Sequence, residues 1–213
     1  MITIYDVILD CVINFGFLLF AFLIFKNNKF AWVPACIAIA LQIYLGSKYS
    51  TLLSFVYLWL HLCVVLVGAI VFFKNTKYSR IKFKKVIIAL STALSLMVIW
   101  VLLMYKYINP AIINLDVLFG FGYLMYILFA IACVLLCYRI HYGLILLATV
   151  FMTNALEYAS AANAAFKSPG YNHDFMLYYC LSAMFLLAAG LFTVTTYTKV
   201  KRLLRTNINP NTN

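Results

Sequence analysis

The chain has 213 residues, of which 67% are hydrophobic and only 10% are charged. A soluble domain has about 25% charged residues, and an apolar excess this large cannot be buried inside a water-facing globule. The formal net charge is +11, but the cations stand between apolar runs rather than on a shared face. We therefore expect an integral, multi-pass membrane protein of a plasma or bacterial inner membrane, with no nucleic-acid partner.

Apolar runs long enough to cross about 30 Å of hydrocarbon recur along the sequence. The first run has Asp6 and Asp10 at its start and no Lys or Arg, so we expect it to be retained rather than removed as a signal peptide. The runs predict one all-α transmembrane domain over residues 1–198 and a tail over 199–213 that is first basic, then polar and disordered. The predicted spans, about seven in number, are 7–25, 30–46, 51–73, 86–105, 117–138, 142–166 and 175–198.

The charges of the loops predict the orientation of these spans. Thirteen of the 16 Lys and Arg residues fall on one side of the membrane, and the other side holds Lys48, Lys106 and Lys167 together with all four aspartates, Asp6, Asp10, Asp116 and Asp174. The thirteen are Lys26, Lys29, six residues of the loop Lys74–Lys85, Arg139, Lys199, Lys201, Arg202 and Arg205. Because cytoplasmic loops are rich in Lys and Arg, we expect the N-terminus outside and the C-terminus in the cytoplasm. The loop Lys74–Lys85 would lie against anionic headgroups.

Seven spans divide as three, one and three. Spans 1–3 and 5–7 would then run in the same direction, which is the plan of a parallel internal repeat. Both halves have a short cytoplasmic turn after their first helix, at 26–29 and 139–141, and a polar-aromatic stretch late in their second helix. The sequence leaves open whether the repeat is real.

Glu157 and His61 are the ionisable residues placed deepest in the spans. They lie about 13 Å and 15 Å from the outer ends of their helices, so both are expected near the midplane. Polar groups in a membrane are costly, which makes each a candidate for function. They could hydrogen-bond each other, couple a proton, or line a pocket. Alternatively, these residues form a structural polar clamp between packed helices, or Glu157 reaches into a wet outer vestibule.

Other polar residues fall at helical spacing. Asn154, Glu157 and Tyr158 share one face of the sixth span. The remaining candidates are Ser54, Tyr57 and Gly68 beside His61 in span three, Asp10 and Asn14 in span one, Gln42 in span two, and Ser91 and Ser95 in span four. We expect a substrate pathway lined by Glu157, His61, Asn154, Gln42, Asn14 and Tyr158. Each polar residue taken singly could instead bond one helix to another.

Familiar catalytic and cofactor motifs are absent from the sequence. It has no Gly-rich phosphate loop, HExxH, GxSxG or zinc-ligand spacing, and its six cysteines fall in or beside apolar runs. Cys133 and Cys137 share a helix face, but buried cysteines usually act as small apolar residues. We expect no cofactor, no metal and no enzymatic activity, although an acid–base pair of His61 and Glu157 remains an alternative.

The segment from Trp32 to Gly68 carries a family resemblance. It contains a Trp opening the second span, Ile43 and Tyr44 near the end of that span, a loop with Lys48 and Tyr49, and then Tyr57 and Trp59. Together with the size and the three-one-three layout, it resembles the Pnu-type transporters, which take up nicotinamide riboside and related vitamins by facilitated diffusion. The SWEET sugar transporters share this plan. Residues 142–158 lack the paired tryptophans that hold substrate in the sixth Pnu-type helix, and only Asn154 matches there; the Pro-Gln pair of the SWEET group is missing too.

Two functions are consistent with these features. The first is a small transporter or channel for a small polar, vitamin-like solute. The second is a non-catalytic subunit of a larger membrane complex, in which the polar residues contact partner helices. Homo-oligomers are compatible with either function.

Overall fold

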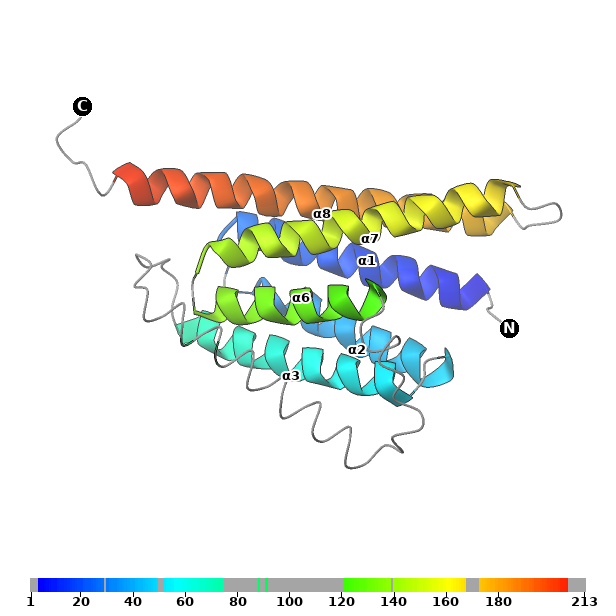
Figure 1. The fold of residues 1–213 in the computed structure, drawn as a ribbon, viewed down its shortest axis with the longest axis horizontal. Helices are drawn as coiled ribbons and strands as arrows, with labels where there is room; N and C mark the ends of the chain where they lie inside the picture. The colour runs from blue at the N-terminus through cyan, green and yellow to red at the C-terminus, as the bar shows by residue number, and fades with distance from the viewer. Residues whose placement is uncertain are drawn as a thin grey trace.

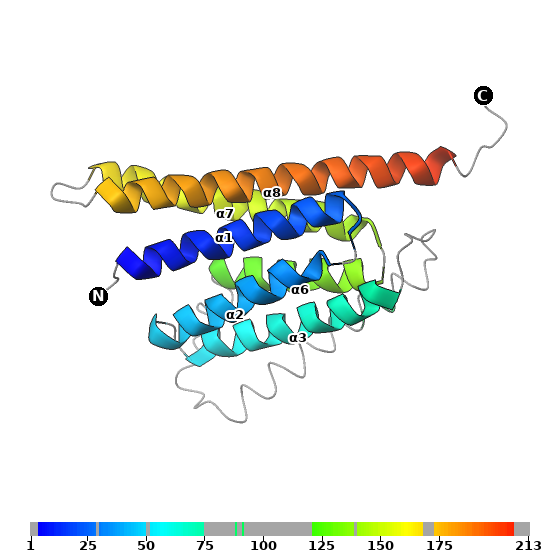
Figure 2. The same ribbon diagram turned by 180° about the vertical axis from the view of Figure 1, so that it is seen from behind.

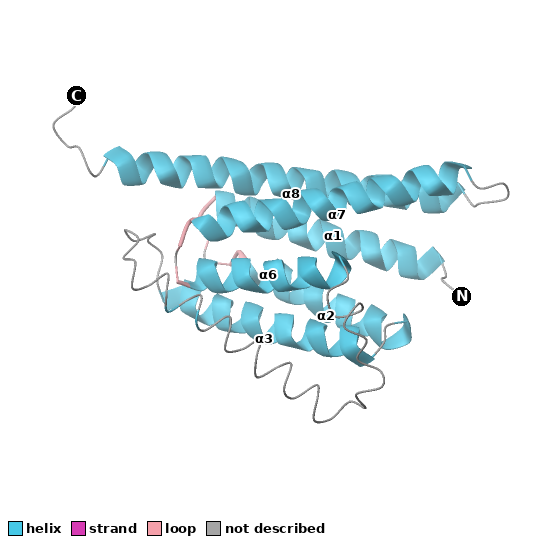
Figure 3. Cartoon of the chain, in the orientation of Figure 1, coloured by secondary structure: helices cyan, strands magenta, loops and turns pink. Residues whose placement is uncertain are grey.

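The computed structural model describes residues 4–28, 30–49, 52–74, 88, 91, 121–138, 140–167 and 173–206. Within these ranges every regular element is an α-helix (Figure 3), so the all-α fold class is confirmed for the described part of the chain. The predicted fourth span, 86–105, lies outside the described residues except for Ile88 and Ser91, and so does nearly all of the basic loop that begins at Lys74.

Six helices are described. Their bounds are α1 (Ile4–Phe25), α2 (Trp32–Tyr49), α3 (Leu52–Lys74), α6 (Phe121–Cys137), α7 (Tyr142–Lys167) and α8 (His173–Thr206). The helices differ from the predicted spans mainly at their ends. The α1 helix begins three residues earlier than predicted, α2 includes residues expected in a loop, and α8 continues into the expected tail. The residues Lys199–Thr206 include Lys, Arg and Leu, which are strong helix formers, so nothing there stops α8.

Three of the described helices are long and apolar enough to cross a membrane. They are Ile4–Phe25, Tyr142–Lys167 and Phe175–Leu204. Shorter apolar helical segments occur at Trp32–Leu45, His61–Ile70 and Met125–Cys137. A chain with three such helices is suited to a bilayer rather than to water.

The helices pack as a closed ring. In order around the ring, α1 contacts α2, α2 contacts α3, α3 contacts α6, α6 contacts α7, α7 contacts α8, and α8 returns to α1 (Figure 1). Four of them, α1, α3, α6 and α8, run in one direction, and α2 and α7 run in the other (Figures 1 and 2). Because α3 ends and α6 begins at opposite ends of the bundle, this placement is compatible with the predicted fourth span between them.

The turns after α1 and α6 have matching hydrogen bonds. After α1, the amide N–H groups of Lys26, Asn28 and Ala31 donate to the carbonyls of Phe22, Leu23 and Asn28. After α6, the same three donor–acceptor pairs recur 112 positions further along the chain, from Tyr138 to Val134, Ile140 to Leu135 and Gly143 to Ile140. Asn27 ends α1 in the left-handed region, with φ of 51°, a conformation that Asn tolerates well.

Both turns lie at one end of the bundle, which we call the basic end. Here the Lys26 ammonium lies over the Phe25 ring, 5.9 Å from its centroid, and Lys199 of α8 lies over the same ring at 5.5 Å. The first residue of α1 lies at the opposite end, which we call the N-terminal end (Figure 1).

The half of the bundle next to the basic end is densely packed. Trp32 is fully buried, and its ring centroid lies 5.2 Å from that of Phe20. A methyl group added at Gly68 would lie 2.7 Å from Trp32 Cζ3 and 2.9 Å from Cys137 Sγ. Four helices therefore meet around Trp32 with no room for even one further carbon atom at Gly68.

Candidate functional site

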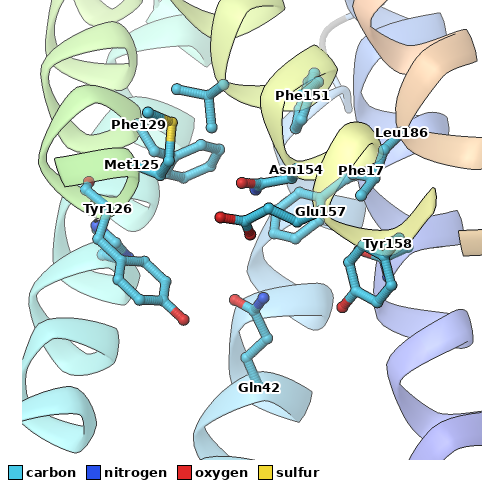
Figure 4. Close-up of a pocket in the computed structure, with 13 residues that line it drawn as sticks. Phe17, Gln42, Met125, Tyr126, Phe129, Phe151, Asn154, Glu157, Tyr158 and Leu186 are labelled. Atoms are coloured by element: carbon cyan, nitrogen blue, oxygen red, sulfur yellow. Dashed lines mark hydrogen bonds between the residues drawn. The ribbon is translucent and has the colours of Figure 1, made fainter. Parts of the chain in front are cut away.

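A cavity of about 150 Å³ lies inside the ring (Figure 4). All six described helices contribute to its wall. The lining residues are Asn14, Phe17, Gln42, His61, Met125, Tyr126, Phe129, Val150, Phe151, Asn154, Glu157, Tyr158 and Leu186. This wall combines amide, carboxyl and phenol groups with aromatic rings, as in sites that bind small organic molecules.

The structure brings together all six residues that the sequence proposed for a substrate pathway. Glu157, His61, Asn154, Gln42, Asn14 and Tyr158 all line this one cavity. They come from four helices, α1, α2, α3 and α7. The side chains of Ser54 and Tyr57, and residue Ser95, lie outside the described part, and Ser91 donates locally to the carbonyl of Ile88.

His61 connects two helices through a hydrogen bond. Its Nε2 lies 2.8 Å from the backbone carbonyl oxygen of Tyr126, and because a carbonyl can only accept, the Nε2–H donates. The imidazole is 2% exposed and packs against the rings of Tyr126 and Phe129. Among the described residues it makes no hydrogen bond to Glu157, so this bond between α3 and α6 favours the clamp role for His61.

Glu157 presents a carboxylate to the cavity. Figure 4 shows its side chain and that of Asn154 pointing into the same space, with the Gln42 amide directed toward them. The Glu157 side chain is exposed rather than buried, and within the described ranges its carboxylate has neither a hydrogen bond nor an ion pair. This environment corresponds to the wet vestibule alternative, and it leaves the carboxylate available to a solute.

Tyr158 ties the cavity to a second carboxyl group. Its hydroxyl donates to Asp10 Oδ2 at 2.5 Å, joining α7 to α1. The Asn14 side chain interacts with the same hydroxyl. Asn14 is 3% exposed, and its amide nitrogen meets no acceptor in full hydrogen-bond geometry in the described part of the chain. An amide nitrogen carries two N–H groups, so the Asn14 amide retains donor capacity in a buried position, and a solute that accepts a hydrogen bond here would be favoured.

An aromatic layer closes one side of the cavity. The centroid of Phe17 lies 5.7 Å from that of Phe129 and 5.9 Å from that of Phe151. Each ring stands three residues closer to the basic end than a polar lining residue of its helix, namely Asn14, Tyr126 and Asn154. Three residues correspond to about 4.5 Å along a helix, so the layer of rings lies closer to the basic end than the layer of polar groups.

Sequence reasoning missed this aromatic layer and Tyr126. The chain contains 18 Phe and 16 Tyr residues, so one more ring in an apolar helix carries no signal by itself. The available signal was the recurring separation of three between a polar residue and a Phe on α1, α6 and α7.

The described residues contain no group of three or more His, Cys, Asp or Glu side chains placed to hold a metal ion. Comparisons with protein-family models, with curated proteins and with solved structures find no match to this chain.

Proposed function

We propose that this chain is a small multi-pass membrane transporter that carries a small polar solute through the cavity inside its helix ring. The observation that carries the proposal is that every described helix contributes to one cavity with amide, carboxyl and aromatic walls. A helix packed only for structural reasons would satisfy its polar groups against its neighbours. Here several polar groups face a shared space instead.

The depth of the cavity supports a membrane pathway. Asn14 follows the start of α1 by ten residues, His61 follows the start of α3 by nine, and Glu157 precedes the end of α7 by ten. At about 1.5 Å per residue, all three lie roughly 15 Å from the N-terminal end. In a hydrocarbon layer of about 30 Å, that is close to the midplane.

The matching turns support the three-one-three repeat. A shift of 112 positions relates their hydrogen bonds, and the order of helices around the ring is unchanged when α1, α2 and α3 are exchanged for α6, α7 and α8. We infer a pseudo-two-fold axis that passes through the ring.

The same shift relates residues of the cavity wall. It relates Asn14 to Tyr126 and Phe17 to Phe129, and it relates Gln42 to Asn154, all of them lining residues. A solute site on the axis between two repeats is a common plan in small transporters. The Pnu-type and SWEET families share this plan. We propose that this chain has the same arrangement of helices as these families, but not the same substrate.

The dense packing around Trp32 favours a transporter over an open pore. In the described part of the chain, the aromatic layer and the buried rings of Phe20 and Trp32 fill the space between the cavity and the basic end. A solute would cross only if the two halves of the ring rocked against each other. We propose that the basic end faces the cytoplasm, where Lys26 and Lys199 meet anionic headgroups.

The test is solute uptake by the purified protein in proteoliposomes, with a panel of vitamins, sugars, small amines and protons. Glu157→Gln keeps the shape of the side chain and removes its charge, so we expect uptake of the transported solute to fall at least about tenfold. Asn163→Ala, an exposed change on the same helix outside the cavity, should leave uptake unchanged. Normal flux in Glu157→Gln would remove this carboxylate from the mechanism.

The alternative of a subunit in a larger complex is tested by purification in mild detergent. A stoichiometric partner that remains bound, together with no uptake of any solute, would favour the subunit role. A monodisperse preparation of this chain alone that supports uptake favours transport.

A further inference from the structure

The cavity wall has a single charge. Among its lining residues Glu157 is the one acidic side chain, and none is Lys or Arg. A second carboxyl group, that of Asp10, lies directly behind the wall and accepts the Tyr158 hydrogen bond. The Nε2–H group of His61 donates to the backbone carbonyl of Tyr126, so this N–H is not available to a solute. Among the described lining residues, therefore, no positive group balances the Glu157 carboxylate.

The negative charge also breaks the approximate symmetry of the site. The shift of 112 positions that relates Gln42 to Asn154 relates Leu45 to Glu157. The wall therefore has one matched amide pair, Gln42 and Asn154, and one matched ring pair, Phe17 and Phe129, but its carboxylate stands on one side only. A solute that is charged at one end and uncharged at the other fits such a wall.

The remaining walls suit an organic cation. Phe17, Phe129 and Phe151 form a connected group of rings, and Tyr126 and Tyr158 stand beside the polar layer. Aromatic faces attract ammonium groups, and the attraction grows when water is excluded. Amide groups of Asn14, Gln42 and Asn154 can hydrogen-bond a hydroxyl or carbonyl at the far end of the solute.

The volume limits the size of the solute. The cavity is about 150 Å³, and an apolar cavity of about this volume in a protein holds one benzene molecule. The fitting solutes have roughly six to eight non-hydrogen atoms by this comparison.

We propose that the cavity binds a small organic monocation, an amine or quaternary ammonium of this size, with Glu157 as its counter-charge and the Phe17–Phe129–Phe151 rings around its apolar part. This proposal rests on the proposed transport function for its physiological meaning. The binding site itself is inferred from the cavity, its aromatic rings and its unbalanced carboxylate.

The test is equilibrium binding to the purified protein in detergent, which requires no transport. Choline is compared with its uncharged isostere 3,3-dimethylbutan-1-ol, with potassium and with acetate. We expect choline to bind at least about tenfold more tightly than the isostere. Glu157→Gln should abolish that difference while Glu157→Asp keeps most of it. Phe129→Leu should weaken choline more than the isostere.

The contrary outcomes are distinct. Equal binding of choline and its isostere, or stronger binding of acetate, would overturn the cation site. Tighter binding of potassium would overturn its organic class. Choline binding without uptake in proteoliposomes would contradict the transport function and leave the cation site intact. Uptake of a neutral solute without choline binding would support the transport function and contradict the cation site. Each variant is accepted only if it elutes from a sizing column as the unaltered protein does.

Discussion

Among the single residues, Tyr158 is shared between the cavity and the packing of the bundle. Its ring lines the cavity, while its hydroxyl satisfies the Asp10 carboxyl on α1. Removing only the hydroxyl would leave that carboxyl without its donor in a half-buried position. A carboxyl group left without its donor there lowers the free energy of unfolding by more than an ordinary surface hydrogen bond contributes to it.

We expect Tyr158→Phe to lower the free energy of unfolding by about 1–3 kcal/mol. The measurement is a thermal or denaturant unfolding curve of the purified protein in detergent. Tyr142→Phe, an exposed tyrosine at the start of α7, is the matched control and should change stability by less than about 0.5 kcal/mol. Equal effects of the two substitutions would show that the Asp10 contact contributes nothing.

His141 is a second residue with a measurable consequence, and it lies in the turn between α6 and α7. Burial, and secondarily the charge of Lys201, lower the pKa of His141 below its ordinary value of 6.5. Its ring contacts the tilted rings of Tyr142 and Tyr197, whose centroids lie 4.5 Å and 5.5 Å away. The folded protein therefore binds fewer protons here than the unfolded chain when the pH falls below 6.5.

It follows that His141 contributes stability in full above pH 6.5, and that this contribution declines as the pH falls below that value. We expect the unfolding midpoint of the unaltered protein to drop between pH 7.5 and pH 5.5. His141→Gln should reduce that drop, since the titrating group is gone. An identical pH dependence in both proteins would contradict this assignment.

At the scale of helices, Gly68 lets α3 lie close against α2 and α6. A methyl group there would lie within 3.0 Å of Trp32 on α2 and of Cys137 on α6. The fully buried Trp32 has little freedom to move away, so α3 would have to shift.

Gly68→Ala should therefore lower the free energy of unfolding by about 1–3 kcal/mol through overpacking. Gly16→Ala on α1 is a milder comparison: its added methyl would lie 3.0 Å from Ala38 Cβ, a tight contact that we expect to cost less than the overlap at Gly68. The comparison is made by unfolding in detergent. A larger loss for Gly16→Ala than for Gly68→Ala would show that the packing around Trp32 is looser than described.

Most helix positions followed from hydropathy, but the helix ends did not. Apolar runs mark where a chain can enter a bilayer, whereas a helix continues as long as its residues allow. This is why α8 extends through Lys199 and Arg202, which are strong helix formers outside the apolar run. The end of α1 depends on the conformation of Asn27 and on local hydrogen bonds, which hydropathy does not register.

The polar part of the site was also predictable from the sequence, because polar groups in a membrane are rare and costly. The six proposed residues line one cavity for this reason. Their partners were not predictable. Nothing in the sequence distinguishes a His61 bonded to a backbone carbonyl from one bonded to Glu157, since the partner depends on which helices become neighbours in the ring.

At the scale of the whole molecule, the separation of charges predicts an orientation that an experiment can check. Lys26, Lys199 and Lys201 belong to the basic end, and Asp6 belongs to the opposite end. By the distribution of Lys and Arg, the basic end should be cytoplasmic.

We expect a fluorescent reporter that matures only in the cytoplasm to be bright when fused after Arg205. Alkaline phosphatase, which is active only outside the cytoplasm, should be inactive at the same position and active when inserted after residue 169. The opposite pattern would reverse the orientation, though not the ring of helices.

The bond between Tyr158 and Asp10 also sets an order of events during synthesis, because 148 residues separate its two ends. A ribosome that adds about 5–20 residues per second needs about 7–30 s to make that stretch. During this time α1 holds an aspartate whose hydrogen-bond donor has not yet been translated. Asp10 lies six residues, or about 9 Å, from the start of α1. An Asp costs about 2.5–3.5 kcal/mol at the centre of a lone spanning helix and less toward its ends, so we expect α1 to remain at the protein-conducting channel or near the headgroups until α7 emerges. Although α1 is translated before α7, it is then among the last helices to take its final place.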